Sequence, residues 1–256
     1  MADFNDQDLA GSTFDDVQLL NAKFRMVDFT GSELKHVRFK DVSILGELVN
    51  VEIEADLDNV RINGVDIVPL VEAELNRRDP DRGIIFGART AAEIRTAWDT
   101  LQQLWEPTIA RLRSLAPDLL HERVDGEWSA VQTLRHLVFA TDSWILRAVL
   151  GDPSPYHPLD LPYDEMPDIP GIPRDYEVRP SLDEILDVRA DRIKIMTELV
   201  SRLTDGQLDG MTEPVEEVGY PESEAFPVRG CVRCILIEEW EHRRYLERDL
   251  DRLTAR

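Results

Sequence analysis

The sequence has few cysteines, little positive charge and no long apolar run, and each absence excludes a class of protein. Its two cysteines, Cys231 and Cys234, are too few for a disulfide framework. Only 29 residues are basic against 51 acidic ones, and the formal charge of −22 argues against nucleic acid or an anionic membrane as a partner. No stretch of 18 apolar residues exists, and Met1 is followed by acidic sequence instead of the apolar core of a signal peptide. We therefore expect a cytoplasmic protein.

The first 50 residues have a period of five. A large apolar residue recurs without a gap at every fifth position: Phe4, Leu9, Phe14, Leu19, Phe24, Phe29, Leu34, Phe39, Ile44 and Val49. This period matches neither an α-helix, with about 3.6 residues per turn, nor a strand, with a repeat of about 2. It predicts a chain that turns a corner every five residues and stacks the large residues inside.

This periodic segment resembles the pentapeptide-repeat family. The resemblance implies a short right-handed quadrilateral β-helix over residues 1–50, which would need a cap at its open end. We interpret residues 51–89 as a strand and helix adapter. It would hold short strands around a turn at Asn63 and Gly64, then a short helix that opens with Pro69.

From Thr90 onward the pattern is helical. Serine or threonine followed three residues later by glutamate or glutamine opens three amphipathic segments, at Thr90, Ser129 and Ser181, and a fourth begins near 228–230. Residues 152–180 hold eight prolines, which predicts a long ordered crossing or a lid. Four long helices with two long connections predict an up-down four-helix bundle over residues 90–256. The whole chain is then expected to be a multidomain α+β protein, with a β-helix followed by this bundle.

Polar residues on two of these helices indicate a metal site. Cys234, Glu238 and His242 are spaced by four, so they share one face of the last helix. His136 lies on one stripe of the second helix with Gln132. Bundle cofactor sites use polar residues that project inward from facing helices, and His136, Glu238 and His242 would leave one coordination position open, as in catalytic zinc sites. The same donors suit iron(II) or nickel.

Two stretches, GEWSAVQTLRHL at 126–137 and EEWEHRRYLERDL at 238–250, resemble the DinB superfamily of metalloenzymes. That family has a Trp-Ser helix start, a histidine several residues later and a His-x-x-x-His motif on the last helix. Here Glu238 replaces the first of those two histidines, as in the mycothiol-dependent maleylpyruvate isomerases. The resemblance covers about residues 90–254. It implies a four-helix bundle of DinB type with a divalent metal, zinc before nickel or iron, at His136, Glu238 and His242.

The same resemblance implies a thiol S-transferase or isomerase. A small thiol of mycothiol type would be held at the metal as the thiolate, which is the nucleophilic form, and would attack an electrophile. Other residues near the two motifs are candidates for contacts with the metal ligands or the substrate: Asp142, Trp144, Cys234, Glu239 and Tyr245. Cys231 and Cys234 lack a second pair, so core packing is the simpler interpretation of both. The charged residues of 239–249 equally fit a solvated ion-pair face.

Two other functions remain open. In one, the bundle is a non-catalytic scaffold and the repeat segment is an interaction surface. In the other, the acidic chain mimics DNA, for which ten repeats form a short rod. We expect a monomer or homodimer whose partners are a small-molecule thiol and an electrophile, with neither nucleic acid nor a membrane.

Overall fold

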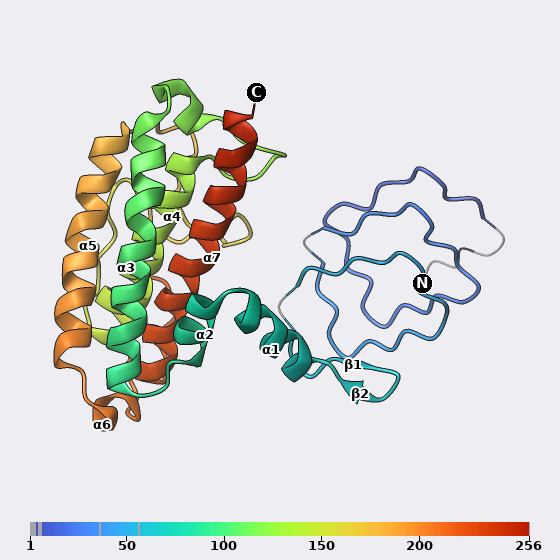
Figure 1. Cartoon of the computed structure of the whole chain (residues 1–256), viewed down its shortest axis with the longest axis horizontal. Coiled ribbons are helices and arrows are strands. Elements are labelled where there is room, and N and C mark those ends of the chain that lie inside the picture. Colours follow the sequence, from blue (N-terminus) through green and yellow to red (C-terminus); the bar gives the residue numbers. More distant parts are fainter. Residues whose placement is uncertain (1–3, 5–6, 36, 56, 256) are drawn as a thin grey trace. The chain divides into compact units, whose positions relative to one another are not determined.

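The computed structural model describes residues 4, 7–35, 37–55 and 57–255, and the chain separates into two compact units, residues 1–55 and 56–256. The first unit contains no strand and no helix among its described residues, and Figure 1 draws it as a winding trace. The five-residue step is present in its backbone, where left-handed residues recur at Gly11, Asp16, Asn21, Met26 and Gly31.

The predicted β-helix over residues 1–50 is wrong, and so is the α+β class that depended on it. Within the described part of this unit, backbone hydrogen bonds join residues three apart, such as Ser12 N–H to Leu9 O at 3.0 Å. The large residues of the repeat keep between 43% (Leu9) and 67% (Ile44) of their surface exposed. A period of five encodes where a chain turns. A β-helix also needs hydrogen bonds between successive coils and a buried interior, and the described residues show neither.

The second unit begins with a hairpin and two short helices. Strands β1 (Arg61–Ile62) and β2 (Val65–Asp66) pair antiparallel, with Ile62 opposite Val65. Asn63 and Gly64 between them both have positive φ, so the turn predicted there is confirmed. Helices α1 (Val68–Arg78) and α2 (Pro80–Gly87) follow, and α2 packs on the helical bundle through the buried Ile85.

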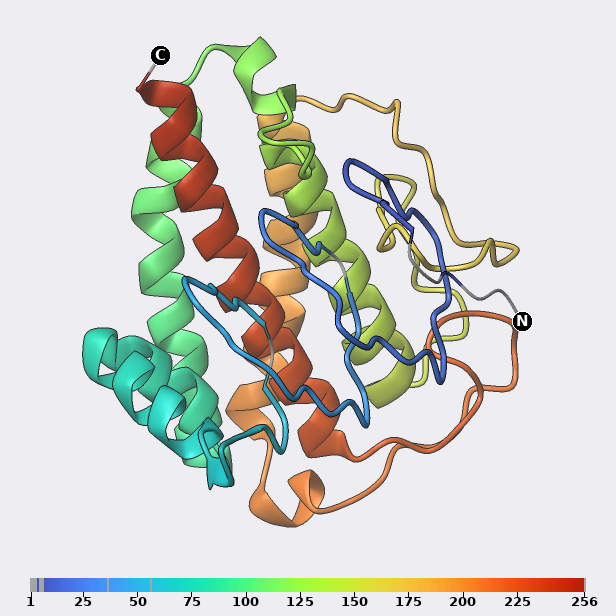
Figure 2. The same cartoon turned by 90° about the vertical axis from the view of Figure 1, so that its right-hand side faces the viewer.

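The rest of this unit is a helical bundle, and Figures 1 and 2 show its long helices side by side. The long helices are α3 (Ala91–Ser114), α4 (Ala130–Thr141) with a π-helical continuation η2 (Asp142–Val149), α5 (Leu182–Arg202) and α7 (Val228–Thr254). The short helices η1 (Pro117–His121) and α6 (Asp205–Leu208) lie in the connections. The predicted capping boxes at Thr90, Ser129 and Ser181 are all present. Pro107 lies inside α3 without ending it.

The order of the long helices around the bundle determines where a site can form. Helix α4 packs against α5 and α7, and α3 packs against the same two helices. Two groups of buried apolar residues fill the interior, one around Trp98 and Trp240 and the other around Leu112 and Leu134. Polar side chains that α4 and α7 direct inward therefore face each other at the α4–α7 interface.

Two buried arginines hold the long connections against the bundle. Arg135 on α4 is fully buried and donates to main-chain carbonyls of the proline-rich crossing, at Leu159, Asp160, Asp175 and Val178. Arg147 on η2 does the same for carbonyls of Pro153 and of the loop before α7, at Val215, Glu217 and Pro221. Buried carbonyls must find donors. Each guanidinium therefore supplies several donors at once, and the proline-rich crossing is an ordered wall of the bundle.

A buried carboxyl pair lies where this crossing meets the bundle. Asp142 and Asp160 are both completely buried. Within the described part of the chain only Asp142 has an arginine partner, Arg192 of α5, which donates to its two carboxylate oxygens at 2.7 and 2.8 Å. Burial, reinforced by the charge of Asp142, raises the pKa of Asp160 well above its usual range. Among the described residues, Oδ1 of Asp160 has no hydrogen-bond partner of its own. A proton there would donate to Asp142, so we interpret the pair as one carboxylate and one neutral carboxyl group.

Substitution by asparagine should separate these two roles. Asp160→Asn replaces a neutral carboxyl by a neutral amide of the same shape and should lower the free energy of unfolding by less than about 1 kcal/mol. Asp142→Asn leaves Arg192 without its buried counter-charge and should lower it by roughly 3–5 kcal/mol. Urea unfolding of both variants at pH 7 measures the difference. Equal losses, or a larger loss for Asp160→Asn, would contradict the assignment of the proton.

Candidate metal centre

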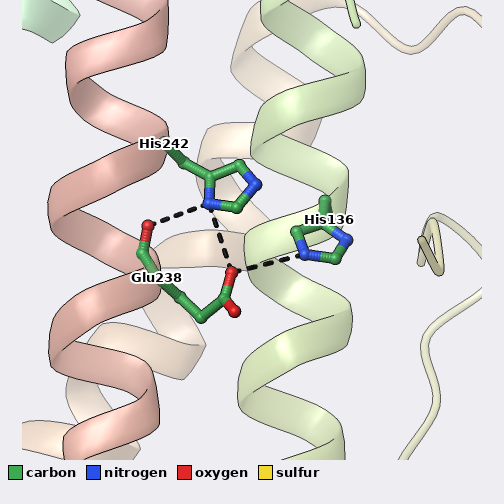
Figure 3. A group of neighbouring side chains, drawn as sticks. All are labelled: His136, Glu238 and His242. Atoms are coloured by element: carbon green, nitrogen blue, oxygen red, sulfur yellow. Dashed lines mark hydrogen bonds and ion pairs between the residues drawn. The ribbon is translucent and has the colours of Figure 1, made fainter. Parts of the chain in front are cut away.

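Three potential metal ligands converge at the α4–α7 interface. His136 lies in the middle of α4, while Glu238 and His242 lie one turn apart on α7. One ligand atom from each residue lies within 4.8 Å of the others. Figure 3 shows the carboxylate of Glu238 between the two imidazole rings. The structure thus brings together the three residues that the sequence nominated.

The contacts within the cluster define the orientation of each histidine. His136 Nε2 lies 3.5 Å from Glu238 Oε2, and its Nδ1 lies 3.0 Å from the carbonyl oxygen of Leu161. The carbonyl can only accept, so Nδ1 carries a hydrogen and Nε2 is the ring nitrogen that faces the cluster. His242 Nδ1 lies 3.0 Å from the carbonyl oxygen of Glu238 and 3.2 Å from its carboxylate, which likewise leaves the lone pair on Nε2.

The electrostatics of the cluster favour the protonation states that a cation requires. Burial raises the pKa of Glu238, but the hydrogen bond with His136 and the electrostatic interactions with the two histidines outweigh burial, so the pKa is lowered overall. Burial, and then the charge of His136, lower the pKa of His242 to about 4. At neutral pH the carboxylate is therefore ionised and the His242 imidazole is neutral. Metal ligands must be deprotonated in this way.

The donor set fits a divalent metal ion. Among the described residues, the Glu238 carboxylate has only His136 and His242 within ion-pair distance, so no arginine or lysine neutralises this partly buried group. Burial of a charge without a full counter-charge is unfavourable. Two imidazole nitrogens and one carboxylate oxygen are suitable ligands for Zn²⁺, Ni²⁺ or Fe²⁺, and three protein ligands leave a coordination position for a further molecule.

A cavity of about 290 Å³ opens over the cluster. Its lining comprises Trp128, His136, Phe139, Ala140, Trp144, Tyr163, Tyr220, Glu238 and His242. Trp128 covers both imidazoles, with ring centroids 4.7 Å from His136 and 6.2 Å from His242. A molecule in this cavity would contact the cluster directly, with aromatic rings on its other sides.

The remaining residues that the sequence nominated have different environments. Trp144 lines the cavity. Asp142 pairs with Arg192, and Glu239 is buried against Arg189 at 3.0 Å, so both carboxylates are used in packing α5 against its neighbours. Tyr245 lies beside His242, with ring centroids 6.0 Å apart, but is outside the cavity lining.

Both cysteines are poorly suited to act as thiolates. Cys231 is buried, and burial raises its pKa to about 11. Burial and the nearby charge of Glu238 raise the pKa of Cys234 to about 12. Neither residue lines the cavity. Core packing, the simpler interpretation from the sequence, fits these environments.

Sequence reasoning missed four of the aromatic residues that line the cavity. Trp128 could have been noticed in the sequence, because it directly precedes the helix-capping Ser129. We interpreted it only as part of the start of a helix. Phe139 lies one turn from His136 on the same stripe of the helix and was not nominated. Tyr163 and Tyr220 belong to the two long connections, where no periodicity indicates which side chains turn inward.

The comparison with known families agrees with the bundle and its site. The DinB superfamily matches residues 70–246, so the chain belongs to the DinB superfamily. The match does not reach residues 1–50, and the resemblance of that segment to pentapeptide repeats has no support from it. No curated protein and no solved structure matches the chain. Among the described residues, no helix has the length and apolar character needed to cross a membrane.

The lowered pKa of His242 predicts a pH dependence of stability in metal-free protein. The unfolded chain takes up a proton near pH 6.5, whereas the folded chain does so only near pH 4. Stability is therefore fully present above about pH 6.5 and falls as the pH drops toward 4, by roughly 3 kcal/mol from this residue. Urea unfolding of the chelator-treated protein between pH 7 and 4 measures the slope. His242→Asn removes the group and should flatten it, and identical slopes for the two proteins would contradict the assignment.

Proposed function

We propose that the chain is a divalent-metal-dependent enzyme that promotes the attack of a small thiol on an electrophile, as an S-transferase or isomerase. One observation carries the proposal: the ligand atoms of His136, Glu238 and His242 lie within 4.8 Å of one another at the floor of a cavity. Membership of the DinB superfamily supports a metal-dependent enzyme in general. The thiol, its mycothiol type and the choice of zinc belong to the proposal alone.

The three residues at the cavity floor would hold the metal. When bound there, a divalent ion supplies positive charge that favours the thiolate form of a thiol at neutral pH. The ionised Glu238 and the neutral His242 are ready to bind it without first losing protons. The hydrogen bond to the carbonyl of Leu161 keeps Nε2 of His136 directed at the cluster.

The surrounding residues exclude water and orient the reactants. Trp128 covers the two imidazoles from one side, and Phe139 and Ala140 of α4 close the cavity beside His136. The high pKa values of Cys231 and Cys234 keep both thiols protonated at neutral pH. The nucleophile must therefore come from a separate thiol molecule.

Substitution of the proposed ligands should affect metal binding first. His242→Ala removes one of three ligands and should weaken zinc affinity by more than about 100-fold, beyond the usual effect of losing a residue that only orients a ligand. Glu238→His keeps three ligands and should retain the metal. His121→Ala is the control, since His121 is the last residue of η1 and lies outside the cluster. Metal content of the purified proteins, measured by inductively coupled plasma mass spectrometry, tests this, and equal content in His242→Ala and wild type would contradict the site.

Thiol chemistry needs its own assay. Metal-loaded protein is incubated with a panel of biological thiols and monochlorobimane, and conjugation is followed by fluorescence. Wild type and His121→Ala should accelerate conjugation of at least one thiol, while His242→Ala should remain at the uncatalysed rate. Equal rates for wild type and His242→Ala across the panel would reject the thiol-transfer function. A scaffold role would then be the better explanation of the chain.

A further inference from the structure

The cavity above the metal ligands has two chemically different halves. Its floor is made by the polar cluster, and its walls are made by five aromatic residues together with Ala140. No lysine or arginine lines it. Burial raises the pKa of Tyr220, so its hydroxyl group is neutral at physiological pH. Apart from the metal ligands, the cavity thus offers ring faces, ring edges and two hydroxyl groups.

The central ring of the aromatic wall is Tyr220. Its centroid lies 5.8 Å from Phe139 at an interplanar angle of 24°, and 5.8 Å from Tyr163 at 66°. Trp144 meets it edge-on at 6.0 Å and 79°. Such offset and edge-to-face arrangements are the favourable ones for aromatic groups, and a flat ring placed against them gains the same contacts.

Tyr220 comes from a loop, yet its backbone is held firmly. The Tyr156 hydroxyl accepts from Tyr220 N–H at 2.7 Å and donates to Tyr220 O at 2.8 Å. A Cβ atom at Gly219 would lie 2.7 Å from both the Tyr156 hydroxyl oxygen and Arg147 Cζ, so a larger residue there would displace these two hydrogen-bonded side chains. The buried Arg147 also binds three carbonyls of the same loop. This wall is pre-organised, and a ligand need not order it on binding.

The charge of the cavity floor and the cavity volume further limit the class of ligand that fits. Without a metal, the Glu238 carboxylate disfavours an anion in the cavity. With a divalent ion bound, the floor carries net positive charge, which disfavours a cation and draws an anionic atom to the metal instead of the aromatic walls. The cavity volume of about 290 Å³ is roughly twice that of an apolar cavity that holds benzene, about 150 Å³. An uncharged compound of one or two rings fits both limits.

We propose that the aromatic half of the cavity binds a flat, uncharged ring of the electrophilic substrate, and that Tyr220 determines this preference. This proposal rests on the proposed function only where it calls the bound ring compound the electrophile. The binding preference itself depends only on the aromatic residues of the cavity. The ring would lie against Tyr220, Phe139 and Trp144, which places its reactive substituent toward the cluster floor. The expected substrate class is therefore neutral aromatic electrophiles, as opposed to carboxylates, phosphates or quaternary amines.

Three probes of the same shape and different charge test the preference. Isothermal titration of the full chain, both as purified and after chelation, compares naphthylmethanol, naphthalenesulfonate and N-methylquinolinium. We expect the neutral probe to bind at least tenfold more tightly than the sulfonate after chelation, and at least tenfold more tightly than the quinolinium when the metal is bound. The affinity of the neutral probe should stay within about threefold between the two preparations. Equal or tighter binding of the sulfonate after chelation, equal or tighter binding of the quinolinium with metal bound, or no binding of the neutral probe would each overturn the proposal.

Variants of Tyr220 identify the wall as the source of the preference. Tyr220→Ala removes the ring and should weaken naphthylmethanol binding about tenfold, while Tyr220→Phe keeps the ring and should stay within about threefold of wild type. Tyr176→Ala is the control, because Tyr176 lies in the crossing beside Arg174 and outside the cavity lining. If Tyr220→Ala does not fold, Trp144→Leu removes a different aromatic ring of the cavity, on η2, and tests the same point. Unchanged affinity in the folded ring-deletion variant, or loss of affinity in Tyr220→Phe equal to that in Tyr220→Ala, would contradict the role of the ring.

The binding titrations and the thiol-conjugation assay can fail independently of each other. The titrations contain no thiol and follow binding alone. Neutral-probe selectivity together with equal conjugation by wild type and His242→Ala would keep the aromatic site and reject the thiol function. The reverse pattern, conjugation without neutral-probe selectivity, would keep the function and reject the substrate class.

Discussion

The burial of one carboxylate between two imidazoles is the constraint on which the rest of the bundle depends. Glu238 lies at the α4–α7 interface with His136 and His242 as its polar partners, and the pKa of His242 is lowered to about 4. At neutral pH an ionised, partly buried carboxylate therefore lies beside a neutral His242, without an arginine or lysine partner among the described residues. Such an arrangement is unfavourable without a cation. A bound divalent ion would join α4 to α7 and stabilise the fold as well as the chemistry.

Two buried arginines make this cluster usable as a site. Arg135 directly precedes His136 and anchors the crossing whose Leu161 carbonyl orients that histidine. Arg147 anchors the second connection, which presents Tyr220 to the cavity. Guanidinium groups satisfy the carbonyls of segments that have no helix or strand of their own. The long loops can then be dry, rigid walls, which a pre-organised site requires.

The sequence predicted that His136, Glu238 and His242 converge, because helical periodicity shows which residues share a face. Spacing by four placed Glu238 and His242 together, and the DinB-type motifs placed His136 opposite them. The same reasoning nominated Asp142 and Glu239 without their arginine partners, because inward polar residues on helices also pair with buried arginines. Arg192 and Arg189 lie about 50 residues away from those partners, and sequence spacing contains no information on which pairs meet.

The loops and the first unit show two further limits of sequence reasoning. Tyr163 and Tyr220 reach the cavity from segments without periodicity, so their direction depends on tertiary contacts such as the Tyr156 hydroxyl. In residues 1–50, the five-residue period correctly marks a repeating backbone turn, seen in the left-handed residues Asp16, Asn21 and Met26. The predicted burial of the large residues required coil-to-coil hydrogen bonds as well, and a periodic sequence alone does not establish them.

The central claim is that His136, Glu238 and His242 bind one divalent ion. X-ray absorption spectroscopy at the zinc edge, on protein loaded with one equivalent of zinc, tests it most directly. The account predicts two imidazole nitrogens and a carboxylate oxygen at about 2.0–2.2 Å, with a remaining light-atom position. It also predicts that adding a thiol introduces one sulfur at about 2.3 Å. A first shell without imidazole, or one dominated by sulfur from Cys231 and Cys234 before any thiol is added, would contradict the account.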